Sequence, residues 1–155
     1  MKQLLLMRHG MTDHPMGTSD RERVLTDEGI KQAEKQGDYI KSHFEVDYIA
    51  CSSAIRTRQT LENLHLPTDI EAVFLDNLYL PSKKNLEEII TCELPDTAHT
   101  ALIVTHFPGV LDFAHYYGHN IHSFPEASIA TFQLNKLHWA DFEKANVNFG
   151  RFIGA

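Results

Sequence analysis

The chain has 155 residues, of which 43% are hydrophobic and 23% are charged, and its formal net charge is −7 with histidine neutral. This length suits one domain with a buried core, so we expect residues 1–155 to form a single domain. The acidic balance argues against nucleic acid and against an anionic membrane surface as partners. Cys51 and Cys92 give no disulfide framework, and we find no signal peptide and no apolar run near the ~18 residues of a membrane span. A cytoplasmic protein is therefore expected.

Short apolar segments alternate with segments of helical spacing along the whole chain. The first apolar segment, residues 3–7, is followed by a polar loop and then by Thr26, which has the character of a helix N-cap. The predicted strands are, in chain order, 3–7, 48–51, 71–75, 100–105, 128–134 and 145–149. The predicted helices begin at Thr26 and end near His43, span 54–64 and 85–94, and open again at Phe107-Pro108-Gly109. This alternation predicts an α/β fold, with a mostly parallel sheet and helices on both of its faces.

Chemically capable side chains follow three of these strands at the point where each strand ends. The first strand runs into Arg8-His9, the second into Ser52-Ser53 with Arg56 one helical turn later, and the fourth into Thr105-His106. Because the carboxyl ends of parallel strands share one edge of a sheet, we expect two histidines and two arginines to meet there.

Such a constellation suits phosphoryl chemistry. Two arginines and a helix N-terminus can hold a dianionic phosphoryl group, one histidine can attack phosphorus, and the other can donate a hydrogen bond to the charged oxygens. A lone strand-end histidine is usually a hydrogen-bonded structural residue, and an arginine on a helix is usually solvated. The joint placement of all four at strand ends favours the catalytic interpretation.

Several segments resemble, in order and spacing, the histidine phosphatase (phosphoglycerate mutase-like) superfamily. The short length and the arrangement of residues 20–25 look most like the small SixA-type phosphohistidine phosphatases. The resemblance implies a three-layer α/β/α sandwich of the phosphoglycerate mutase-like type, and a metal-independent activity that needs no cofactor. It also implies that His9 becomes phosphorylated while Arg8, Arg56 and His106 hold the phosphoryl group. The matching segments are Leu6–Gly10, Leu25–Gly29, Ser52–Thr60, Val104–Gly109 and Pro125–Ala130.

The chain departs from the mutase branch of that family in lacking an evident general acid. The segment 76–93, where those members carry a catalytic glutamate, is short, and its Glu87 and Glu88 have positions that predict exposure to solvent. A site without an acid suits a substrate with a good leaving group, such as the imidazole of phosphohistidine. Asp13 is the nearest spare carboxylate, and it reads either as the acid or, more simply, as a turn residue.

Ten histidines also raise the question of a metal site. The residues His115, His119 and His122 have a helical spacing, but no cysteine or carboxylate completes a ligand set, so no metal is predicted. The leading functional hypothesis is a phosphatase that works through phosphohistidine and acts on protein phosphohistidine. One alternative is a metal-independent phosphomonoesterase for a small metabolite, and another is an inactive phosphate-binding regulatory module. The partner is accordingly a phosphorylated protein or a small phosphorylated substrate.

Overall fold

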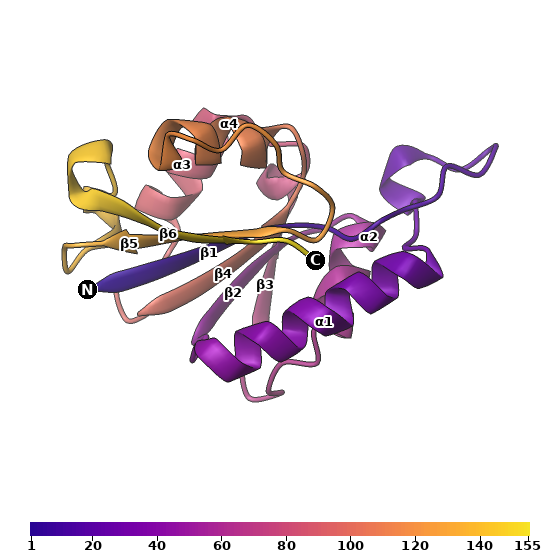
Figure 1. Cartoon of the computed structure of the whole chain (residues 1–155), viewed down its shortest axis with the longest axis horizontal. Coiled ribbons are helices and arrows are strands. Elements are labelled where there is room, and N and C mark those ends of the chain that lie inside the picture. Colours follow the sequence, from indigo (N-terminus) through magenta and orange to yellow (C-terminus); the bar gives the residue numbers. More distant parts are fainter.

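A computed structural model describes residues 1–155, and its centre is one six-stranded sheet with the order β3-β2-β4-β1-β5-β6 (Figure 1). The four strands β1 to β4 pair in parallel, whereas β5 and β6 are antiparallel additions at one side. This arrangement confirms the mostly parallel sheet. The strands are β1 (Lys2–Arg8), β2 (Tyr48–Ser52), β3 (Ala72–Leu75), β4 (Thr100–Thr105), β5 (Ile129–Leu134) and β6 (Val147–Ile153).

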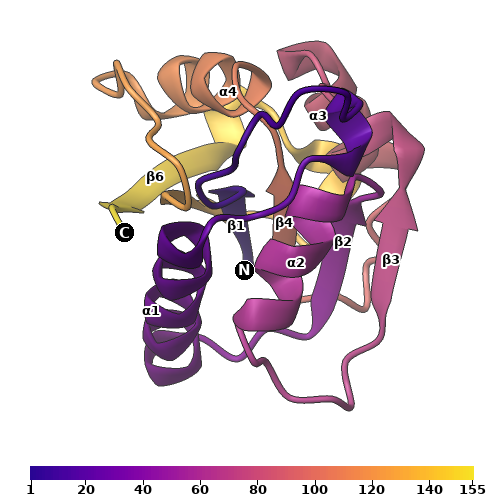
Figure 2. The ribbon, with the colours of Figure 1, turned by 90° about the vertical axis from the view of Figure 1, so that its right-hand side faces the viewer.

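Helices cover both faces of the sheet and complete the three layers that were predicted. The helices α1 (Asp27–His43) and α2 (Ile55–Asn63) lie on one face, and α3 (Lys83–Cys92) and α4 (Gly109–Gly118) lie on the other (Figures 1 and 2). Alternate residues of β1 supply the two cores, since Leu4 and Leu6 belong to the cluster under α3 and α4. Leu5 and Met7 belong to the cluster under α1. A strand buried on both faces in this way reads as a continuous apolar run, as β1 does.

The boundaries of the helices follow local capping. The Thr26 side chain accepts a hydrogen bond from the backbone N–H of Gly29 at 3.0 Å, which confirms the predicted N-cap of α1. Helix α3 begins at Lys83, two residues before the predicted start, because Ser82 and Asn85 form a reciprocal capping box. The last strand also differs from the prediction, because β6 begins at Val147 and continues to Ile153.

The loop after β1 packs closely against the start of α1. A Cβ atom on Gly10 would lie 2.7 Å from the Gly29 carbonyl oxygen, and one on Gly29 would lie 2.2 Å from the Met11 carbonyl oxygen. No side chain can be placed at such distances, so both positions require glycine. An isolated antiparallel bridge between Thr12 and Leu25 closes the loop further along. The residue after β1 is thereby fixed relative to α1. No helix of the molecule is both long enough and apolar enough to cross a bilayer.

Candidate active site

The structure brings Arg8, His9, Arg56 and His106 together at the carboxyl edge of the sheet. Arg8 is the last residue of β1 and pairs in register with Thr105, the last residue of β4, so His9 and His106 leave adjacent strands side by side. The centroids of the two imidazole rings are 5.5 Å apart. Arg56, in the first turn of α2, places its Nε 3.3 Å from His9 Nε2. The geometric expectation drawn from the strand ends therefore agrees with the coordinates, while the roles of the four residues stay predictions.

The imidazole of His9 is held in one tautomer. Its Nδ1 lies 2.7 Å from the Gly10 carbonyl oxygen, which can only accept a hydrogen bond, so Nδ1 carries the proton. The lone pair of Nε2 then accepts a hydrogen bond from Arg56 Nε–H, which a bound anion can take over when the nitrogen acts as a nucleophile. Burial is the main cause that lowers the pKa of His9 to about 3, and the positive charges of Arg56 and Arg8 add to it, although the Gly10 hydrogen bond opposes the shift. At neutral pH His9 is thus uncharged, with the nitrogen opposite Gly10 available as a nucleophile.

The imidazole of His106 is also buried and uncharged at neutral pH. Burial lowers its pKa to about 3, with further contributions from the charges of Arg56 and of a protonated His9. Its Nε2 lies 2.7 Å from Ser52 Oγ, and its Nδ1 has no hydrogen-bond partner within the protein. When Ser52 donates to Nε2, the ring proton resides on Nδ1 and forms a free N–H donor.

Arg8 approaches the site from the other side. Its Nη1 donates to the Phe124 carbonyl oxygen at 2.8 Å, and its guanidinium lies 4.7 Å from the centroid of the Phe107 ring. Its Nε is buried and lacks a partner within the protein. Only three buried side-chain nitrogen or oxygen atoms of the molecule lack a partner, and they belong to Arg8, His106 and Ser128. The Ser128 backbone carbonyl oxygen accepts a hydrogen bond from the Arg8 backbone N–H at 3.1 Å, so all three residues lie near the carboxyl end of β1.

Unpaired buried polar atoms are costly, and native proteins contain few of them. Their concentration here, next to the buried Arg56, His9 and His106, is what a site built for an oxyanion would display. Because the unpaired atoms of Arg8 and His106 can donate hydrogen bonds from a guanidinium and an imidazole, a tetrahedral phosphoryl group is a suitable acceptor.

Asp20 is a site residue that the sequence analysis did not single out. Its carboxylate Oδ2 lies 3.0 Å from Arg56 Nη2 and also accepts a hydrogen bond from the Tyr79 hydroxyl group. Its backbone oxygen accepts from Arg56 Nη1 at 2.6 Å, and its Oδ1 lies 3.1 Å from Arg23 Nη1. The hydrogen bond from Tyr79, followed by those from Arg23 and Arg56, holds the pKa of Asp20 well below its usual range.

These contacts fix the orientation of Arg56, whose side chain is only 2% exposed. The Nε of Arg56 then points to His9, while both terminal nitrogens are anchored on Asp20. The only sequence signal for Asp20 was its place in the polar segment 20–25, which resembles the SixA type. Nothing in the spacing indicated a pairing with Arg56 across 36 positions.

The two carboxylate predictions have different outcomes. Asp13 lies on the exposed loop after β1, and its carboxylate makes no hydrogen bond or ion pair with the four site residues. Its role as an acid stays a prediction. The predicted exposure of Glu87 is wrong, because this side chain is partly buried between Lys83 and Tyr117, and it accepts hydrogen bonds from both. Glu88 is exposed, as expected.

The histidines of α4 and the loop after it do not assemble a ligand set. His115 Nδ1 lies 2.9 Å from the Ile121 carbonyl oxygen, and its ring centroid is 5.2 Å from that of His122. His119 follows as the C-cap residue of α4. No group of three or more histidine, cysteine, aspartate or glutamate side chains in the chain is placed to hold a metal ion.

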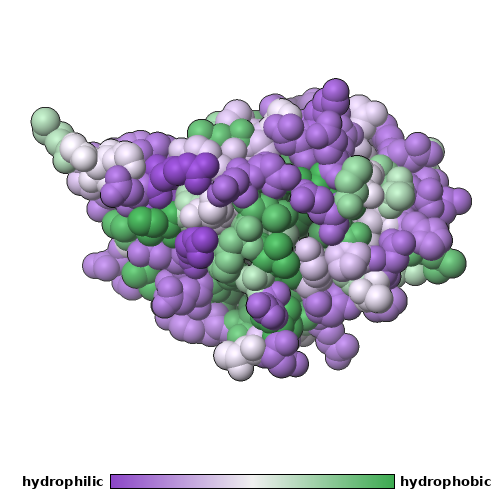
Figure 3. Space-filling model, turned by 180° about the vertical axis from the view of Figure 1, so that it is seen from behind, coloured by the Kyte–Doolittle hydropathy of each residue, from purple (hydrophilic) through white to green (hydrophobic).

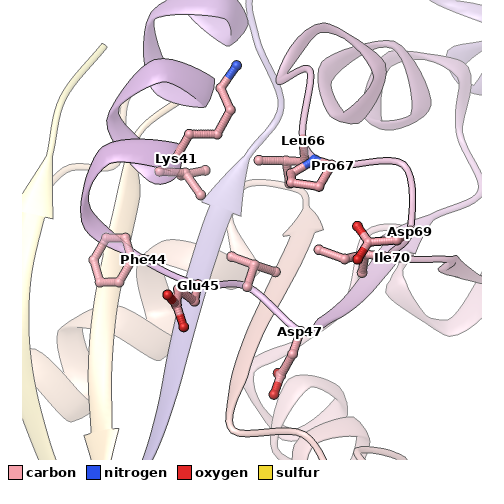
Figure 4. A pocket seen from close by; sticks show the side chains of 10 residues that line it. Lys41, Phe44, Glu45, Asp47, Leu66, Pro67, Asp69 and Ile70 are labelled. Carbon is pink, nitrogen blue, oxygen red and sulfur yellow. The ribbon is translucent and has the colours of Figure 1, made fainter.

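A groove of about 520 Å³ lies at the opposite, amino edge of the parallel strands (Figure 4). It runs between the end of α1 and the loop that leads into β3, and none of the site residues contributes to it. Its walls are mostly apolar with a rim of charged side chains, and the lining residues are Ile40, Lys41, Phe44–Asp47, Leu66, Pro67, Asp69 and Ile70.

Comparisons with known proteins agree with this geometry. Residues 4–79 match the model of the histidine phosphatase superfamily (branch 1). An uncharacterized protein of Mycobacterium tuberculosis (strain H37Rv) is 31% identical over 149 residues, which cover 88% of this chain and 92% of that protein. The chain belongs to the histidine phosphatase superfamily, as its sequence motifs predicted.

Solved structures of SixA-type proteins share the whole fold. The protein histidine phosphatase SixA, solved with tungstate, superimposes with a TM-score of 0.80 at 22% identity, covering 98% of this chain and 96% of the other. A SixA-type protein from Nakamurella multipartitia gives a TM-score of 0.86 at 24% identity, covering 98% and 95% of the two chains. These matches confirm the phosphoglycerate mutase-like fold.

Proposed function

We propose that this protein is a phosphatase that works through a phosphohistidine on His9 and that its substrate is a phosphohistidine carried by another protein. The observation that carries the proposal is the fixed tautomer of His9, whose Nε2 lies beside Arg56 while Nδ1 is bonded to Gly10. A neutral imidazole with a directed lone pair is a competent nucleophile toward phosphorus. The unpaired polar atoms of Arg8 and His106 next to it provide donors for the phosphoryl oxygens.

In the first step His9 Nε2 attacks phosphorus, and the bond between phosphorus and the leaving nitrogen of the substrate breaks. That nitrogen keeps the electron pair of the broken bond, and a proton already held on the other nitrogen of the substrate ring lets it leave as neutral imidazole. Arg8 and Arg56 balance the negative charge of the transferring group, and His106 donates a hydrogen bond to it. In the second step water attacks phosphorus, the bond to Nε2 breaks, and orthophosphate and a proton are released.

The carboxylates near the site support a substrate with a good leaving group. Asp20 is the carboxylate that contacts the constellation, and its pairing with Arg56 and Tyr79 keeps it ionised at neutral pH. An ionised carboxylate cannot donate a proton to a leaving alkoxide. An imidazole requires no such donor, because it is protonated on its own ring before it leaves.

Membership of the histidine phosphatase superfamily and the overall likeness to SixA-type structures support the same proposal. The tungstate in the related SixA structure is a tetrahedral oxyanion, as phosphate is. An equivalent position in this chain would lie among Arg8, His9, Arg56 and His106. We expect a bound phosphate to accept hydrogen bonds from all but the nucleophile at about 2.7–3.2 Å.

The test is a competition among substrates. The protein should be offered a phosphohistidine peptide, an aryl phosphate and a panel of phosphorylated metabolites, each with and without EDTA. We expect the peptide to have the highest kcat/KM, chelation to leave the rates unchanged, and His9→Ala to abolish turnover. His14→Ala, which removes an exposed histidine from the next loop, is the matched control and should keep full activity. A metabolite turned over faster than the peptide would indicate a small-molecule phosphatase, and phosphate binding without turnover would indicate an inactive binding module.

A further inference from the structure

Arginine is concentrated at one edge of this acidic molecule. The chain has six arginines, and all except Arg151 come from the segments 8–23 and 56–58 that surround the candidate active site. Lysines, in contrast, are spread along the sequence. Arg8 and Arg56 line the site itself, and Arg23 is paired with Asp20. The remaining two, Arg21 and Arg58, take no part in the proposed phosphoryl transfer.

Arg21 and Arg58 converge on one residue at the rim of the site. Arg21 Nη1 donates to Ser53 Oγ at 2.9 Å, and Arg58 Nε donates to the Ser53 carbonyl oxygen at 3.0 Å. Each guanidinium also lies over an aromatic ring at 4.0 Å, Arg21 over Tyr79 and Arg58 over Phe74. These contacts restrict both side chains, so that less conformational entropy is lost when they bind an anion.

The carboxylate that competes for the rim pair is that of Asp76, which also accepts a hydrogen bond from Ser53 Oγ at 2.5 Å. Asp76 Oδ1 lies 3.8 Å from Arg21 Nη1, and the side chains of these two residues are 85% and 48% exposed. An ion pair that is so exposed to water contributes little to stability, so Arg21 can exchange it for a pair with a substrate carboxylate. The Tyr79 ring under Arg21 contacts His106 edge-on, with centroids 5.2 Å apart, which places the rim next to the phosphoryl-transfer residues.

We infer that Arg21 and Arg58 form a docking rim for carboxylate side chains that flank the phosphorylated residue of a protein substrate. The inference rests on the proposed function and adds a preference in substrate sequence. The guanidinium groups of Arg21 and Arg58, which both contact Ser53, can bind aspartate or glutamate, because a guanidinium can bind a carboxylate through two parallel hydrogen bonds. The acidic remainder of the protein would repel such a substrate, so attraction is confined to this edge.

The surroundings of the rim favour a protein segment over a small molecule. Small ligands are usually enclosed, whereas Phe74 and Ile55 beside the rim are 40% and 37% exposed. Seen from behind, apolar side chains gather in the middle of the face that carries the open edge of β3, the strand of Phe74 (Figure 3). An exposed surface with both cations and apolar side chains can contact residues on either side of a phosphorylated histidine.

The test compares two phosphohistidine peptides, one with aspartates on both sides of the phosphorylated residue and one with asparagines. In the wild-type protein we expect the aspartate peptide to have a kcat/KM about three- to tenfold higher, because two exposed charge contacts are involved. The preference should shrink when NaCl is raised from about 0.05 to 0.5 M. The double variant R21Q/R58Q should bring the ratio of the two peptides close to one. The double variant K41Q/R151Q removes the same charge far from the site and should keep the wild-type ratio.

An aryl phosphate assayed in parallel distinguishes a failure of the proposed function from a failure of the docking rim. If the wild type hydrolyses neither peptide nor the aryl phosphate, the proposed function itself fails and the docking rim with it. If it hydrolyses both peptides equally well, the function stands and the docking rim is wrong. A preference for aspartate that survives in R21Q/R58Q also overturns the assignment, because other residues must then recognise the carboxylates.

Discussion

The two ends of β1 carry two cations that differ in their hydrogen bonding: Lys2 is buried, and Arg8 is partly buried. At the amino end Lys2 is 3% exposed, and its Nζ donates to the carbonyl oxygens of Asp96 and Ala98 at 2.6 and 2.8 Å. At the carboxyl end, the buried Nε of Arg8 has no partner within the protein. A buried charge that is hydrogen-bonded within the protein contributes to the stability of the fold, whereas a cation with a buried, unpaired donor can bind a ligand. The cation at the amino end of β1 is thus bound by backbone oxygens, whereas the cation at the carboxyl end keeps a donor that can bind an anion.

The largest effect on turnover is expected when the nucleophile at the carboxyl edge of the sheet is removed. His9→Gln should lower turnover of an aryl phosphate by at least about 10⁴-fold, as removal of a covalent catalyst does. The fold should remain, because glutamine can keep the contact with the Gly10 carbonyl oxygen. Rapid quenching of the wild type with labelled substrate should trap acid-labile phosphate, which the variant should lack. Comparable turnover by the variant would exclude His9 as the phosphorylated residue.

Exchanging the two cations of β1 for methionine should separate activity from stability. Arg8→Met should lower kcat/KM by about 10²–10³-fold, because a charge-assisted contact to the transferring group is lost. Lys2→Met should leave kcat/KM unchanged but lower the free energy of unfolding by about 2 kcal/mol, because two buried carbonyl oxygens lose a charged donor.

Urea unfolding and steady-state kinetics on both variants check this pair of expectations. If Arg8→Met were the more destabilised of the two and retained its activity, the functional contrast between the two ends of the strand would be refuted.

A smaller effect is expected from Asp20→Asn, which weakens the anchor of Arg56. The amide still reaches the arginine but carries no charge, so Arg56 should lose some of its fixed orientation, and kcat/KM should fall by about tenfold. A positioning role also predicts that the loss grows as the leaving group becomes poorer, which linear free-energy plots for a series of aryl phosphates would measure. The same loss for every leaving group would instead point to a defect in folding or binding, and Asp13→Asn serves as the control on the exposed part of the loop.

The pH dependence of the free energy of unfolding should reflect the burial of His9 and His106 at the carboxyl edge of the sheet. Burial lowers the pKa of His9 and of His106 to about 3, whereas an unfolded histidine titrates near 6.5. Between these pH values the unfolded chain binds more protons than the folded one, so stability rises with pH across this window and is lost as pH falls from about 6.5 toward 3.

The measurement is the urea midpoint at several pH values in this window. His9→Gln should lose less stability on acidification than the wild type, while the exposed-site variant His14→Gln should follow the wild type. Equal pH slopes for all three proteins would contradict an uncharged, buried His9.

Sequence patterns predicted the features of this fold that depend on near neighbours. The apolar run of β1, the cap at Thr26 and the delivery of His9 and His106 to one edge all follow from local spacing and from the parallel arrangement of the strands. The anchoring of Arg56 on Asp20 could not be predicted, because it joins an irregular loop to a helix through tertiary structure. Glu87 was misjudged for a similar reason, since its burial depends on Tyr117 from another helix.

The segregation of arginine places five of the six guanidinium groups of the chain around the candidate active site. In a protein of net charge −7, these guanidinium groups are where an approaching anion meets local attraction. Encounters that begin at this edge are favoured over those that begin elsewhere, so the association rate constant should fall as ionic strength rises. Charge placement of this kind shortens the search for a partner in addition to the contacts that it makes in the final complex.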